Sequence, residues 1–111
     1  MRNVTRILAA GIVMAAWTVP AAAQGDAAKG QELFAAQKCS MCHAVAGKGN
    51  AKYPLDGAGT RLDAATVKLW LTDPKAAEAK TGKKAKPPMK SFASLPAADI
   101  DALVAYVMSL K

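Results

Sequence analysis

The sequence predicts an all-α protein of three or four helices joined by long loops. Apolar side chains recur with the 3.6-residue period of an amphipathic helix in three segments. No segment alternates with the two-residue period of a strand over a useful length, so we expect no sheet. Glycines and prolines interrupt the chain between these segments, and two of the resulting loops exceed the usual connection length. Long loops in a small domain usually serve function, so we expect the chemistry there.

The N-terminus predicts a secretory signal peptide, residues 1–23. Arg2 and Arg6 give it a positive start, an uncharged apolar run follows from Ile7 to Trp17, and small residues lead up to Ala23. A membrane anchor is the alternative, but an apolar run of this length rises about 16 Å as a helix, against a hydrocarbon core of about 30 Å. We therefore expect Sec-type export to the periplasm, cleavage after Ala23, no stable membrane insertion afterwards, and one domain of residues 24–111.

The first helix of this domain is predicted over residues 26–38. Leu33 and Phe34 lie on its apolar face, and Gly30 interrupts the same face. A glycine inside a helix costs about 1 kcal/mol relative to alanine, so Gly30 either marks the close passage of another helix or is simply tolerated. Residues 44–61 contain four glycines and one proline and are predicted to be a loop.

The second helix is predicted to begin with Asp63 as its N-cap. Leu62 and Val67 have the spacing of a hydrophobic staple around that cap. Pro74 is expected to end the helix, because the residue before a proline disfavours helical backbone.

The C-terminal part combines a lysine-rich segment with a last helix. Residues 75–91 are expected to form a short helical turn near 75–80, followed by extended chain. The last helix is predicted from about Pro96 to Leu110, since its apolar residues follow the i, i+3, i+4, i+7 pattern and proline suits a first-turn position.

The stretch KCSMCHAVAG, residues 38–47, contains both cysteines and the only histidine of the chain. Cys39 and Cys42 are one helical turn apart, and His43 follows directly. A redox disulfide belongs in a βαβ context that is missing here, a structural zinc needs four ligands, and a plain disulfide leaves the histidine without a role. C-x-x-C-H is instead typical of covalent haem c, in which the thiols add to the haem vinyl groups and the histidine binds iron. The low aromatic content, 5%, agrees with a buried haem that supplies apolar volume.

Iron in such a site takes a sixth ligand or keeps an open position. No second histidine exists, and a methionine thioether is the usual partner in electron-transfer haems. Met41 lies inside the motif on the side of its histidine, and Met108 belongs to the apolar stripe of the last helix as core filler. Met89 lies on an irregular loop after Pro87 and Pro88, which stiffen its approach. We predict Met89 as the axial ligand, with an open or lysine-ligated site as the alternative.

With these features the chain resembles the class I monohaem cytochromes c of bacteria over residues 24–111. The likeness consists of the order of N-terminal helix, C-x-x-C-H, glycine-rich loop with a proline, methionine loop and C-terminal helix. In that family the first and last helices cross at a glycine and an aromatic, which KGQELFAAQKC matches through Gly30 and Phe34, and LVAYVMSL through Leu103 and Tyr106. The resemblance assigns Gly30 to close helix packing and implies the cytochrome c fold around one covalent haem.

The resemblance also implies a role for Pro54 in YPLDG. In the family, the carbonyl of the loop proline accepts a hydrogen bond from the ligand histidine's other nitrogen, which fixes the tautomer. The match is looser here, because Tyr-Pro-Leu-Asp replaces the usual Gly-Pro-x-Leu, and Pro96 stands where a serine or threonine cap is common. Trp70 is expected either to pack on the haem edge or to donate to a haem propionate.

A haem held by His43 and Met89 has no open position for a substrate. We therefore expect outer-sphere electron transfer without enzymatic turnover, by a monomeric periplasmic electron carrier between redox partners of a respiratory or dehydrogenase chain. One alternative is an open-site haem protein, such as a gas sensor or weak peroxidase. The other is a haem subunit fixed on one oxidoreductase complex.

A cluster of lysines in the basic chain predicts redox partners with acidic docking patches. Five lysines surround the methionine loop: Lys80, Lys83, Lys84, Lys86 and Lys90. A lysine run is ordinarily a solvated face, but beside a haem edge it steers an acidic partner and speeds encounter. Nucleic acid is not an expected partner for an exported protein with so few aromatics.

Overall fold

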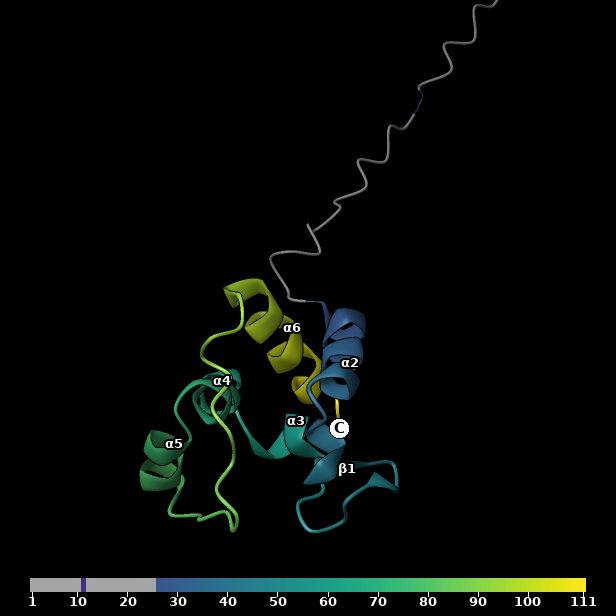
Figure 1. Ribbon diagram of the computed structural model, residues 1–111. Helices are drawn as coiled ribbons and strands as arrows, with labels where there is room; N and C mark the ends of the chain where they lie inside the picture. The colour runs from purple at the N-terminus through teal and green to yellow at the C-terminus, as the bar shows by residue number, and fades with distance from the viewer. Residues whose placement is uncertain (1–10, 12–25) are drawn as a thin grey trace, which may run out of the picture.

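The computed structural model describes residue 11 and residues 26–111, and the remaining residues of the predicted signal peptide, with the start of the predicted domain at 24, lie outside the described part. The elements in chain order are α2 (Ala27–Ala36), the 3-10 turn η1 (Cys39–Met41), β1 (Ala44–Val45), β2 (Lys48–Gly49), α3 (Ala58–Arg61), α4 (Ala64–Thr72), α5 (Pro74–Thr81) and α6 (Ala97–Met108). The protein is thus mainly helical, as predicted (Figure 1). Within the described residues, no helix combines the length and apolarity that crossing a membrane requires.

The first and last helices, α2 and α6, cross in direct contact at Gly30 (Figure 1). A Cβ added to Gly30 would lie 2.7 Å from the carbonyl carbon of Ala102 and 2.7 Å from the Cβ of Tyr106, closer than real Cβ contacts allow. Beside this contact the rings of Phe34 and Tyr106 meet edge to face, with centroids 5.5 Å apart. The predicted crossing at a glycine and an aromatic pair is therefore confirmed.

Capping side chains define the two middle helices. Asp63 accepts a hydrogen bond from the Thr66 N–H at 2.7 Å, so the predicted N-cap of α4 is confirmed. The predicted single turn near 75–80 is a full helix, α5, because Asp73 ends α4 and also caps α5 by accepting from the Ala76 N–H at 3.1 Å. Pro74 occupies the first turn of α5, and Gly82 ends it with φ 71°.

The predicted loop 44–61 contains three short elements that the sequence pattern did not show. β1 and β2 form a two-stranded antiparallel hairpin, and α3 adds a short helix that binds the C-terminus through the Gly59 N–H and the Leu110 carbonyl, 2.7 Å apart. The turn residues Ala46 and Gly47 have φ 51° and 78°, as a two-residue hairpin turn requires. Strands of two residues cannot show an alternating pattern, so the expectation of no sheet was wrong.

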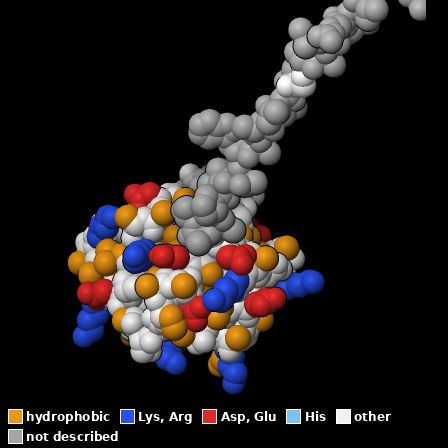
Figure 2. All heavy atoms as spheres, turned by 90° about the horizontal axis from the view of Figure 1, so that it is seen from above, with side chains coloured by type: hydrophobic (Ala, Val, Ile, Leu, Met, Phe, Trp, Pro, Cys, Tyr) orange, Lys and Arg blue, Asp and Glu red, His pale blue; other side chains and the backbone are white. Residues whose placement is uncertain are grey.

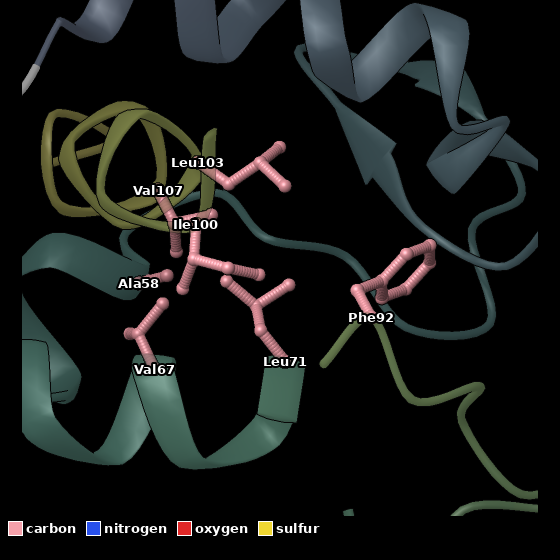
Figure 3. Packing of buried hydrophobic residues seen from close by; sticks show 7 residues of the cluster. All are labelled: Ala58, Val67, Leu71, Phe92, Ile100, Leu103 and Val107. Carbon is pink, nitrogen blue, oxygen red and sulfur yellow. The ribbon is translucent and has the colours of Figure 1, made fainter. Parts of the chain in front are cut away.

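The hydrophobic core lies between α3, α4 and α6 (Figure 3). Side chains of α6 meet those of α3 and α4, and Phe92 lies apart from the other six at one side of the group (Figure 3). The buried members are Ala58, Val67, Leu71, Phe92, Ile100, Leu103 and Val107. Further apolar side chains pack against this cluster while remaining half-buried: Leu33, Phe34, Leu55, Leu62, Met89, Leu95, Val104 and Met108. The predicted role of Met108 as core filler is confirmed.

Charges of both signs share the face on which α2 and α6 begin (Figure 2). Lys29 of α2 forms an ion pair with Asp99 of α6 at 3.0 Å, and Lys68 lies 3.9 Å from Asp101. This face therefore has its positive charges next to negative ones.

Candidate functional site

The C-x-x-C-H motif forms one helical turn directly after α2. Lys38 takes a left-handed backbone conformation, φ 56°, and η1 then begins at Cys39. The Cys39 carbonyl accepts hydrogen bonds from the N–H groups of Cys42 and His43, at 3.2 and 3.0 Å. The two cysteines thus stand one turn apart, as expected, and both thiols are free rather than joined in a disulfide.

The Cys39 thiol is unlike that of a redox-active pair. Its desolvation by burial raises the pKa above 9.0 and the neighbouring Cys42 raises it further, against a backbone hydrogen bond that lowers it. Thiols that exchange disulfides rapidly have a lowered pKa instead. The half-buried Cys39 therefore gives no support to the redox-disulfide interpretation.

The His43 ring is oriented by a backbone carbonyl of the following loop. Its Nδ1 lies 2.8 Å from the carbonyl oxygen of Tyr53. A carbonyl oxygen only accepts, so Nδ1 bears the hydrogen and Nε2 keeps its lone pair for a metal. This is the arrangement that a histidine ligand of iron requires.

The prediction that the Pro54 carbonyl accepts the hydrogen bond from His43 is wrong by one residue. The carbonyl of Tyr53 accepts from His43, and the N–H of Leu55 donates to the Ala44 carbonyl at 2.8 Å. The residues on either side of Pro54 thus direct their polar groups toward His43 and Ala44. These two hydrogen bonds set the register in which the Tyr53 carbonyl, and not that of Pro54, meets the imidazole.

The zinc interpretation gains no support from the fold. Within the described residues, no three or more histidine, cysteine, aspartate or glutamate side chains gather where they could hold a metal ion together. A structural zinc site needs four such ligands.

Met89 lies on the irregular segment 82–91, between α5 and the core residue Phe92. Its side chain is half-buried and packs against the hydrophobic core. The segment is fastened to the end of α4, because the Ser91 hydroxyl donates to the Thr72 carbonyl at 3.0 Å and the Phe92 N–H donates to the Leu71 carbonyl at 2.7 Å. Ligation of iron by Met89 stays a prediction.

On the N-terminal side of Met89, the segment is hydrogen-bonded to the loop that orients His43. The N–H of Lys86 donates to the Tyr53 hydroxyl oxygen at 2.9 Å, and the Lys52 ammonium donates to the Lys86 carbonyl. No sequence motif identifies Tyr53 or Lys52, since the contact of Tyr53 with Lys86 joins residues 33 apart and leaves no local pattern. The one feature of the sequence that could have indicated Tyr53 is its position next to the loop proline, Pro54.

The remaining predicted residues lie on separate elements. Trp70 is half-buried on α4, and its contact with the cofactor stays a prediction. Met41 is 69% exposed, away from the core. All five lysines around Met89 are exposed, although the Lys80 ammonium donates to the Thr66 hydroxyl at 3.1 Å.

These residues fit a covalently bound haem. Two free thiols stand one helical turn apart, and the adjacent histidine presents a free Nε2. Half-buried apolar side chains around the core, Met89 among them, offer surface that a large planar group can cover. Cys39 and Cys42 would hold it covalently, and His43 would bind its iron.

A sequence model of one protein family, described as cytochrome c, matches residues 27–111. The match includes the C-x-x-C-H motif, the Tyr53 loop and Met89. No curated protein and no solved structure matches the chain significantly.

Proposed function

The chain belongs to the cytochrome c family, whose haem is attached through cysteines such as Cys39 and Cys42, and we propose that it is a periplasmic electron carrier with His43 and Met89 as its axial iron ligands. Haem binding and electron transfer follow from the family. The ligand pair, the compartment and the redox partners in a respiratory or dehydrogenase chain are our proposal.

The orientation of His43 is the observation that most supports this function. The Tyr53 carbonyl holds the ring at 2.8 Å through Nδ1, so Nε2 is presented in one tautomer and one orientation. A hydrogen bond from the second nitrogen also makes a histidine ligand more basic. Haem would supply iron that gains or loses one electron. A histidine ligand held in this way need not move when the oxidation state of the iron changes.

The hydrogen bonds and packing around Met89 support its role as a permanent sixth ligand of the iron. Its segment is hydrogen-bonded on the upstream side at Lys86 and on the downstream side at Ser91, and the side chain packs on the core. A pre-ordered segment loses little entropy when its methionine binds iron. Methionine opposite histidine raises the reduction potential, which suits an electron carrier.

The exposed lysines support a transient encounter with an acidic partner. Lys83, Lys84 and Lys90 are exposed along the Met89 segment, and Lys52 extends this group through its bond to Lys86. Attraction between such a group and an acidic patch raises the association rate and weakens with salt. Met41 is, within the described residues, the one exposed large hydrophobic side chain, which agrees better with a transient partner than with a fixed complex.

The test is an optical spectrum of the protein exported together with a haem-maturation system. It is recorded oxidised, reduced, and reduced under carbon monoxide. We expect a low-spin reduced form, a weak iron–sulfur band in the oxidised form, and little change with carbon monoxide. Met89→Ala should lose the band and bind carbon monoxide, whereas Met108→Leu, a change of the other methionine packed on the core, should keep the band.

Two outcomes would contradict the proposal. A high-spin haem that binds carbon monoxide at once in the unmodified protein means an open position, and the function is then that of a sensor or weak peroxidase. Loss of the band in Met108→Leu but not in Met89→Ala would move the ligand to the last helix.

A further inference from the structure

We propose that Tyr53 is a positioning residue that couples the two ligand segments, holding His43 through its backbone carbonyl and the Met89 segment through its phenol. This inference rests on the proposed His43 and Met89 ligation. The contacts themselves belong to the folded chain: the His43 Nδ1 to Tyr53 carbonyl distance is 2.8 Å, and the Lys86 N–H to Tyr53 hydroxyl distance is 2.9 Å.

The phenol side of this link binds the backbone of Lys86. The Lys86 N–H donates to the phenol oxygen, and the phenol lies 3.4 Å from the Lys86 carbonyl, which also accepts from the Lys52 ammonium. Both backbone polar groups of Lys86 are thereby bound to residues 52 and 53. Met89 follows three residues later, so the position of Lys86 limits where the sulfur can lie.

The carbonyl side of the link is held in register by the adjacent backbone. One residue after His43 and two residues after Tyr53, the Leu55 N–H donates to the Ala44 carbonyl at 2.8 Å. The Tyr53 ring is half-buried, with its centroid 6.3 Å from that of the imidazole. A tyrosine held at both backbone and hydroxyl transmits a displacement of one ligand segment to the other.

Tyr53→Phe removes the phenol oxygen and leaves the carbonyl in place. The Lys86 N–H then loses its acceptor, and the Met89 segment opens more readily. Because the lost hydrogen bond is solvent-exposed, we expect a moderate effect, about a threefold to tenfold gain in the affinity of the ferric holoprotein for added imidazole, which displaces the methionine.

Two variants serve as controls in the same holoprotein. Ser91→Ala removes the tether on the other side of Met89, which ends at Thr72 and not at the histidine loop. Tyr106→Phe deletes a phenol oxygen from the α2–α6 crossing. Ser91→Ala should also raise imidazole affinity, and Tyr106→Phe should leave it unchanged.

The distinguishing measurement is hydrogen exchange by NMR in the reduced protein, at the His43 ring N–H and at the Lys86 amide. Tyr53→Phe should speed exchange at both sites, whereas Ser91→Ala should leave the His43 ring N–H unchanged. If Tyr53→Phe alters imidazole affinity but not exchange of the His43 ring N–H, the coupling is absent and the proposal is overturned. The proposal is equally overturned if Tyr53→Phe behaves like Tyr106→Phe.

Failure of this inference is separable from failure of the proposed function. If the unmodified protein has no iron–sulfur band, the ligand pair is wrong before any tyrosine variant is tested. Exchange at the Lys86 amide still reports the phenol contact in that case, because it does not depend on which ligand binds iron. No acceleration there in Tyr53→Phe would refute the phenol contact itself.

Discussion

The α2–α6 crossing and the Met89 segment are held in place by different means. At the crossing, Gly30 lets two helices meet backbone to backbone, and the Phe34 and Tyr106 rings pack beside the contact. The Met89 segment has no regular structure between α5 and Phe92, and individual hydrogen bonds at Lys86 and Ser91 fasten it. The crossing depends on shape, and the segment depends on a few polar contacts with distant residues.

This difference predicts how substitutions in each region affect the protein. An atom added to a close-packed contact lowers the stability of the protein strongly, because the surrounding atoms have little room to move. A segment held by several exposed hydrogen bonds loses one of them at a moderate cost and can open without global unfolding. We therefore expect substitutions at the crossing to affect stability most, and those around Met89 to affect ligand binding and partner encounter.

The largest expected effect is that of Gly30→Ala on stability. Alanine favours helix over glycine by about 1 kcal/mol, but its Cβ would meet the Ala102 backbone, so we expect a net loss of about 1–3 kcal/mol. Guanidinium unfolding of the holoprotein measures the change. Gln31→Ala, at an exposed position of the same helix, is the control and should change little. A stabilised Gly30→Ala protein would show that the helices do not meet this closely.

The second effect concerns rates of electron exchange and compares lysines of the Met89 segment with lysines that lie next to carboxylates of α6. Lys83→Gln with Lys84→Gln removes two positive charges from the Met89 segment, and Lys29→Gln with Lys68→Gln removes two that lie next to Asp99 and Asp101. At low salt the first pair should slow oxidation by hexacyanoferrate about threefold, through weaker attraction, and the second pair by less.

Stopped-flow absorbance at increasing ionic strength provides the measurement. The difference between the two double variants should vanish at high salt, because screening removes long-range attraction. Equal slowing in both would mean that only net charge matters, and that the lysines around Met89 have no special place in the encounter.

The smallest expected effect is a pH dependence in α4, the helix whose last carbonyls hold the Met89 segment. Hydrogen bonds from the side chain and backbone N–H of Thr66 hold the pKa of Asp63 below its ordinary 3.8. Because the folded pKa is the lower one, the carboxylate's stabilisation is complete above pH 3.8 and is lost as the pH falls through the folded value. Asp63→Asn keeps a capping oxygen but cannot titrate.

Thermal unfolding of both proteins, from neutral pH to below 3.8, tests this expectation. The unmodified protein should lose more stability than Asp63→Asn in the acid range. Parallel curves would show that the cap contributes no pH dependence.

Short-range patterns were enough to predict most helices and the attachment motif. Asp63 and Pro74 mark the ends of α4 through contacts within a few residues, and C-x-x-C-H places two thiols and an imidazole on adjacent positions of one turn. The same patterns predicted α5 as a single turn, because Asp73 serves as a cap to two helices at once. The hairpin of Ala44–Val45 and Lys48–Gly49 was not predicted, since two-residue strands have no period.

The sequence by itself determined the haem-binding motif and the amphipathic helices, since these depend on residue type and on spacing within a turn or two. Only the tertiary structure decided that Tyr53, and not Pro54, orients His43, and that the same tyrosine binds Lys86. The physical reason is that one backbone carbonyl is chemically like its neighbour. Which backbone carbonyl meets the imidazole depends on the conformation of the loop between His43 and Tyr53. No local pattern of side chains predicts that conformation.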